Sequence, residues 1–121
     1  MKMTWIGRIV SVAVCLPFVM SASMKLTSNP QVLEGMVHFG IPETLILPLG
    51  IIEALCVVIY LIPLTSVLGA ILLTGYLGGA IVTHLRMGEA VYIQVALGIV
   101  IWLGLFLQDA RIRQILPIKK G

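Results

Sequence analysis

Long apolar stretches, separated by short polar segments, dominate the chain. A bilayer-spanning helix needs about 20 mainly apolar residues. Four stretches approach that length, at about residues 5–26, 44–62, 65–83 and 90–107. The pattern therefore predicts an all-α fold, an integral membrane four-helix bundle that forms one domain over residues 1–121.

The segment between the first two stretches has a different pattern, with apolar and polar residues on opposite sides of a short helix. Asn29 can cap this helix, and Pro30 suits its first position. Gly40 and Pro42 then end it and turn the chain. We therefore predict a short amphipathic helix that lies along the outer membrane surface.

Basic residues gather near both ends of the chain, at Lys2, Arg8, Arg111, Arg113, Lys119 and Lys120. Segments on the cytoplasmic side of membrane proteins are enriched in lysine and arginine. We therefore expect both termini in the cytoplasm, with the amphipathic helix on the outer face of a cytoplasmic (inner) membrane. Pro63 and Leu64 then form a tight inner turn between the second and third spans.

The first stretch also resembles a secretory signal peptide, because it has a basic start, an apolar middle and small residues at its end. Cleavage after Ser23 would leave three spans. An even number of spans places both basic ends on one side of the membrane without further assumptions. A retained helix is therefore preferred, and whether residues 1–23 are ever cleaved stays open.

The composition excludes a soluble domain and several kinds of site. The chain is 60% hydrophobic and 11% charged, whereas soluble domains average about 25% charged residues. Most of the surface must therefore face the lipid bilayer. The net charge is +3, and most of the basic residues lie near the ends of the chain. This distribution indicates which side of the membrane the ends face, and it does not indicate a nucleic-acid surface. The two cysteines and two histidines show no spacing typical of a metal or catalytic site.

One acidic residue, Glu53, interrupts the second apolar stretch. It lies about nine residues from the outer end of its helix, which corresponds to about 14 Å in a hydrocarbon core about 30 Å thick. An acidic residue at that depth costs roughly 2.5–3.5 kcal/mol on the insertion scale. We therefore expect Glu53 to face the bundle interior, where it is either protonated or hydrogen-bonded to a partner.

The third stretch brings small residues and hydroxyl groups to the level of Glu53. Gly75 and Gly79 form a GxxxG pattern, which often allows helices to pack closely in lipid. The same glycines could instead leave space for a ligand, with Thr74 or Tyr76 supplying a hydroxyl. Both interpretations remain open, and the pattern permits a homo-oligomer as easily as packing within one chain.

A second group of polar residues falls at the outer ends of three helices. Its members are Ser23, Lys25, His84, Arg86 and Gln94. Lysine and arginine here could simply reach lipid phosphates. Their convergence above a buried acid instead favours a binding site that opens to the outer face. The candidate ligand-binding residues are therefore Ser23, Lys25, Glu53, Gly75, Tyr76, Gly79, His84, Arg86 and Gln94.

The order and spacing of four motifs resemble the DoxX-like family. These motifs are SASMKL (21–26), FGIPETL (39–45), GIIEAL (50–55) and LGAILLTGYLGGAIVTHLR (68–86). The resemblance implies a four-helix membrane protein, usually of the bacterial cytoplasmic membrane, and it supplies no catalytic residues. Some relatives are linked to quinone-coupled sulfur oxidation or oxidative-stress complexes, and distant members look like assembly factors. The matching polar positions are Ser23, Lys25, Glu53, His84 and Arg86.

Three functions are compatible with these features. The preferred one is binding of a small amphipathic ligand, a quinone or a lipid, around Glu53 in the service of a membrane redox system. The second is a structural, accessory or assembly-factor role beside a membrane or redox partner protein. Proton-coupled transport ranks last, because the chain shows neither a series of acids nor an inverted repeat. Relatives with redox roles can have extra domains or soluble subunits, so we do not expect this chain to be an enzyme by itself.

Overall fold

Helices account for all the regular structure in the computed structural model, which describes residues 2–27 and 29–116. The helices are α1 (Lys2–Leu26), α2 (Pro30–His38), α3 (Ile46–Leu61), α4 (Ser66–Arg86), α5 (Tyr92–Gln108) and α6 (Ala110–Ile115). Two short 3-10 turns, η1 (Glu43–Leu45) and η2 (Pro63–Thr65), precede α3 and α4. The predicted all-α fold is confirmed.

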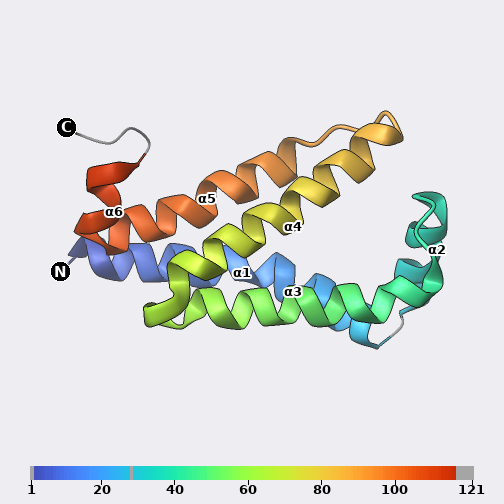
Figure 1. Ribbon diagram of the computed structural model, residues 1–121, viewed down its shortest axis with the longest axis horizontal. Coiled ribbons are helices and arrows are strands. Elements are labelled where there is room, and N and C mark those ends of the chain that lie inside the picture. The colour runs from blue at the N-terminus through green and yellow to red at the C-terminus, as the bar shows by residue number, and fades with distance from the viewer. Residues whose placement is uncertain (1, 28, 117–121) are drawn as a thin grey trace.

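The four long helices pack side by side in a ring (Figure 1). Helix α1 contacts α3 and α5, and α4 contacts the same two helices from the other side. Helix α2 and the loop 87–91 lie at one end of the bundle, which we call the α2 end. Helix α6 and the start of α1 lie at the other end, the α6 end.

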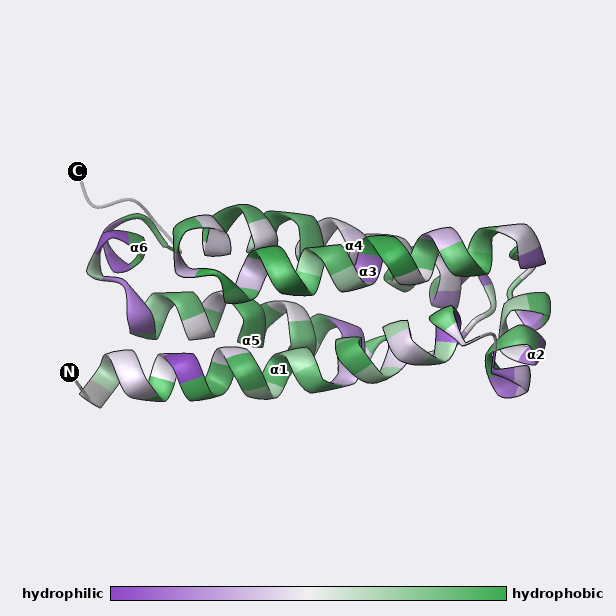
Figure 2. Cartoon of the chain, turned by 90° about the horizontal axis from the view of Figure 1, so that it is seen from below, coloured by the Kyte–Doolittle hydropathy of each residue, from purple (hydrophilic) through white to green (hydrophobic). Residues whose placement is uncertain are grey.

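The surface of the bundle is suited to lipid. Three helical segments are long and apolar enough to cross a membrane, namely Met3–Leu26, Glu43–Leu61 and Pro63–Arg86. Helix α5 is equally apolar but has 17 residues, which is the lower limit for a membrane span. Figure 2 shows hydrophobic residues along the whole length of the long helices and hydrophilic ones concentrated toward α2 and α6. The protein is therefore a helical membrane bundle, and the fourth span stays a prediction.

The local signals at the helix ends act as expected. The Asn29 side chain accepts a hydrogen bond from the Gln31 backbone N–H, and α2 begins at Pro30. After α2 the chain turns at Gly40, whose φ of 75° lies in the left-handed region that glycine tolerates best. Helix α6 was not predicted, although Asp109 caps it by accepting a bond from the Arg111 backbone N–H.

The half of the bundle near the α6 end is tightly packed. Gly69 of α4 lies so close to Tyr60 of α3 that a Cβ atom at this glycine would overlap the Tyr60 backbone. The Tyr60 hydroxyl lies 2.9 Å from the Ser11 hydroxyl and donates a bond of 2.6 Å to the Ile101 carbonyl. Gln108 donates to the same Ser11 oxygen at 2.6 Å. These bonds join α1, α3 and α5 at one level.

The half near the α2 end is open along α4. A Cβ atom at Gly75, Gly78 or Gly79 would meet nothing within 4 Å. The C-terminal end of α3 and the start of α4 lie close together at η2, and the two helices diverge toward the α2 end (Figure 1). Within this bundle, the interpretation of Gly75 and Gly79 as a close helix-packing motif is therefore wrong. The glycines border open space.

Candidate functional site

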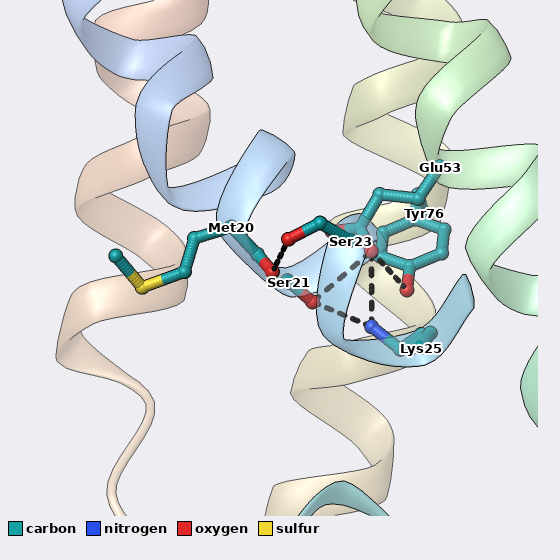
Figure 3. Close-up of polar contacts among 6 residues, drawn as sticks. All are labelled: Met20, Ser21, Ser23, Lys25, Glu53 and Tyr76. Atoms are coloured by element: carbon teal, nitrogen blue, oxygen red, sulfur yellow. Dashed lines mark hydrogen bonds and ion pairs between the residues drawn. The ribbon is translucent and has the colours of Figure 1, made fainter. Parts of the chain in front are cut away.

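Glu53 occupies the inward face of α3 and is 2% exposed. Its Oε1 atom accepts three hydrogen bonds: from Lys25 Nζ at 2.9 Å, from the Ser21 hydroxyl at 3.0 Å and from the Tyr76 hydroxyl at 3.2 Å (Figure 3). Lys25 and Ser21 belong to α1, and Tyr76 belongs to α4. The expectation that Glu53 faces the interior and has a partner is confirmed. This carboxylate joins three helices.

Lys25 forms a buried ion pair with Glu53 and is 6% exposed, so the alternative in which it reaches lipid phosphates is wrong. Every Cα–Cβ bond of a helix tilts toward the helix N-terminus. Because Lys25 lies at the C-terminal end of α1, its side chain leans back into the bundle. Gly50 of α3 makes room for it, since a Cβ atom at Gly50 would lie 2.8 Å from the Lys25 Cβ atom.

Ser21, which the sequence analysis missed, occupies the position expected for Ser23. Lys25 donates a second bond, of 2.5 Å, to the Ser21 hydroxyl. Residues four apart lie on the same face of a helix, whereas residues two apart do not. Ser23 therefore points away from Glu53, is exposed and donates to the Met20 carbonyl at 2.9 Å. The spacing between Ser21 and Lys25 was the signal that could have identified Ser21.

A cavity of about 660 Å³ borders the buried ion pair. Ligand sites typically have volumes of about 300–1,000 Å³ and mostly apolar walls with a few polar groups. Lys25, Glu53 and Tyr76 supply polar groups here, while Gly75 and Gly79 form part of the wall. The apolar wall includes Phe18, Met36, Phe39, Leu45, Leu49 and Leu77. The cavity thus combines a large apolar surface with a compact polar group.

His84 also lines this cavity and connects it to the α2 end of the bundle. Its Nδ1 atom lies 3.0 Å from Oε1 of Glu89, and the other oxygen of Glu89 lies 3.4 Å from Nε2 of His38. The Phe39 ring packs edge-on against both histidine rings. Arg86 donates to the Phe39 carbonyl, but it is exposed and does not border the cavity. These contacts join the end of α2 to α4 and the following loop.

Two residues expected near Glu53 lie elsewhere. Gln94 lines a second hollow of about 670 Å³ between α4 and α5, together with Thr74, Gly78 and Trp102. The Thr74 hydroxyl accepts a bond of 2.9 Å from the Trp102 indole nitrogen. Tyr76 therefore supplies the hydroxyl at Glu53, and Thr74 does not.

The described residues contain no group of three or more His, Cys, Asp or Glu side chains arranged to hold a metal ion. Cys15 and Cys56 are buried free thiols.

Comparison with known families matches residues 9–107 to the model of the DoxX-like family, a range that includes Lys25, Glu53 and Tyr76. The chain belongs to the DoxX-like family. Comparisons with curated proteins and with solved structures found no significant match. The family and the apolar helices together identify this DoxX-like protein as a membrane protein, and the family assigns it no activity.

The buried pair can be tested by a double-mutant cycle. Removing one partner of a buried ion pair typically costs about 3–5 kcal/mol, because the other charge stays buried and unpaired, whereas replacing both partners by apolar residues is often neutral. We expect Lys25→Met and Glu53→Leu each to lower the thermal unfolding temperature in detergent strongly. We expect the double variant to recover most of that loss.

Asp109→Asn is a matched control, because it removes an ion pair whose Arg111 side chain is 89% exposed. The hydrogen bond from Arg111 lowers the pKa of Asp109, so this pair is charged at neutral pH. Exposed pairs contribute little to stability, and the unfolding temperature should hardly change.

Additive effects of Lys25→Met and Glu53→Leu on the unfolding temperature would contradict the buried pair.

Proposed function

We propose that this protein binds a small amphipathic molecule, a quinone or a lipid, in the cavity beside Glu53, in the service of a membrane redox system. The observation that carries this proposal is the position of the Lys25–Glu53 pair on the wall of a cavity of about 660 Å³. A polar head group can lie against the pair, and an apolar tail can lie along the side chains of α1, α3 and α4.

The location of the cavity also supports an amphipathic ligand. It is partly open and lies in a bundle whose outer surface is apolar. The divergence of α3 and α4 leaves the space beside Gly75 and Gly79 unfilled by side chains. The atoms that line such a space lack van der Waals partners, and an apolar ligand tail would supply them.

A structural or accessory role is the second candidate, and one observation favours it. The Glu53 carboxylate receives bonds from α1 and α4 while belonging to α3, so it would hold these helices together even without a ligand. A structural tie alone, however, needs no cavity beside it. Proton-coupled transport has less support, since Glu53 is the only buried carboxylate among the described residues.

Filling the cavity should weaken binding without unfolding the protein. Gly79→Leu places a side chain in the cavity, where its Cβ atom meets nothing within 4 Å. Overpacking an occupied site typically costs about 1–3 kcal/mol, so we expect a short-chain ubiquinone analogue or a fluorescent lipid to bind about tenfold more weakly. A fluorescence titration of the purified protein in detergent would measure this change.

Gly78→Leu is the matched control. It makes the same substitution one residue earlier, where the glycine borders the second hollow and a Cβ atom also meets nothing within 4 Å. Affinity should stay at the wild-type value. Equal affinity for the Gly79→Leu variant and the wild type would rule out this cavity as the binding site.

We further propose that the protein has four spans and lies in a bacterial inner membrane with both termini in the cytoplasm. Helix α6, which contains Arg111 and Arg113, lies at the same end of the bundle as the start of α1, which contains Arg8. Basic residues at one end of a bundle favour the cytoplasmic side. Lys119 and Lys120, which belong to the same predicted basic tail, lie outside the described residues.

Cysteine labelling of intact cells tests this orientation. The native thiols Cys15 and Cys56 are buried, so background labelling should be low. We expect a membrane-impermeant maleimide to label Gly35→Cys in α2 directly, and Ala110→Cys in α6 only after the cells are permeabilised. The reverse pattern would show the opposite orientation.

A further inference from the structure

The two carboxylate oxygens of Glu53 have different surroundings. Oε1 accepts the bonds from Ser21, Lys25 and Tyr76, whereas Oε2 accepts none within the described part of the chain. No fully buried side-chain nitrogen or oxygen atom among these residues lacks a hydrogen-bond partner. Oε2 must therefore be reachable from open space. Because Glu53 lines the cavity of about 660 Å³ and is otherwise enclosed, that space is the cavity.

The donors around Glu53 are already engaged. The hydroxyl hydrogens of Ser21 and Tyr76 point to Oε1. Lys25 has three N–H donors; one is directed to Ser21 and one to Glu53, and the ammonium also lies 5.6 Å from the centroid of the Tyr76 ring. The polar wall therefore offers a ligand a strong acceptor, Glu53 Oε2, and few free donors.

In its neutral form, His84 offers a second acceptor at the border of the cavity. Its Nδ1 atom bonds to the carboxylate of Glu89, and since a carboxylate only accepts, this nitrogen carries the proton in the neutral ring. The other ring nitrogen, Nε2, is then an acceptor, and it has no hydrogen bond within the described residues. With His84 neutral, acceptors predominate on the polar side of the cavity.

Charge restricts the ligand further. The positive charge of Lys25 is balanced by Glu53 at 2.9 Å, so the wall is neutral overall and exposes a carboxylate oxygen. An anionic head group would be repelled by that oxygen. A neutral hydroxyl would donate to it in a charge-assisted hydrogen bond, which is about twice as strong as a bond between neutral groups.

We infer that the cavity selects a neutral amphipathic alcohol, whose hydroxyl donates to Glu53 Oε2, over a carbonyl or ether analogue of the same shape. This inference rests on the proposed function, because it requires that the cavity binds an amphiphile. Two sources of such a hydroxyl exist in a membrane, the reduced form of a quinone and a lipid alcohol. For a quinone, the quinol form binds more tightly than the oxidised form.

Two matched ligand pairs test this selectivity on the wild-type protein in detergent. One pair is a long-chain alcohol and its methyl ether, and the other is a short-chain ubiquinol analogue and its quinone, kept under anaerobic conditions. A hydrogen bond to a charged group is strong enough to change affinity by about tenfold or more. In each ligand pair that binds, we expect the hydroxyl compound to have a Kd at least about tenfold lower than its ether or quinone partner, as measured by calorimetry.

The outcomes separate this inference from the proposed function. Selective binding of the ubiquinol identifies a quinol as the source, and selective binding of the alcohol identifies a lipid alcohol. An ether or quinone that binds as tightly as its hydroxyl partner would overturn the selectivity and leave the binding function standing. If none of the four compounds binds, both proposals fail.

Glu53→Gln provides an independent test, because it should remove the preference for the hydroxyl compounds, whose oxygen can also accept a hydrogen bond. Three donors point at Oε1, so the amide oxygen must occupy that position, and the amide nitrogen then replaces Oε2. The group that faces the ligand changes from an acceptor to a donor. We expect the ether and the quinone to gain affinity relative to their hydroxyl partners.

Glu34→Gln is the control for this variant, since Glu34 is an exposed residue of α2 that does not border the cavity. It should keep the wild-type preference. A folded Glu53→Gln protein that still prefers the hydroxyl compounds would overturn the assignment to Oε2. The ligand pairs on the wild-type protein give an answer even if this variant does not fold.

Discussion

The Lys25–Glu53 ion pair is the interaction on which the rest of the site depends. Neither charge is tolerated in hydrocarbon alone, so the pair must form inside the bundle and be shielded from lipid. The contact of 2.9 Å between Lys25 Nζ and Glu53 Oε1 fixes how α1 faces α3. The hydroxyl groups of Ser21 and Tyr76 bond to the same Oε1 atom. The polar part of the site is therefore set by the requirement to satisfy one carboxylate.

The cavity follows from a second constraint, the difference in packing between the two halves of the bundle. Near the α6 end, Gly69 allows α4 to contact the backbone of Tyr60, whose hydroxyl is itself tied to α1 and α5. Helix α4 then diverges from α3 toward the α2 end, and Gly75 and Gly79 leave the resulting space empty. Tight packing at one end thus holds the bundle together while the other end contains a cavity.

Much of the fold could be predicted from the sequence, because lipid imposes simple rules on length and polarity. The apolar stretches, the Pro30 helix and the inward direction of Glu53 all follow from such rules. The direction of Lys25 could not be judged from hydropathy, since snorkelling and burial both suit a lysine near a helix end. Gly75 and Gly79 were ambiguous because a glycine pattern does not reveal whether a neighbouring helix fills the space. Gln94 was misplaced because its helical face depends on how α5 rotates against α4.

The central claim is that the cavity beside the ion pair holds a small amphipathic molecule, and native mass spectrometry of gently extracted protein tests it most directly. A binding cavity predicts a species at the 13.1 kDa chain mass, or a multiple of it, plus one defined small molecule per chain. The Gly79→Leu protein should lack that molecule, and the Gly78→Leu protein should retain it. Protein that is free of any defined small molecule, or that has the same heterogeneous lipids in all three forms, would contradict the claim.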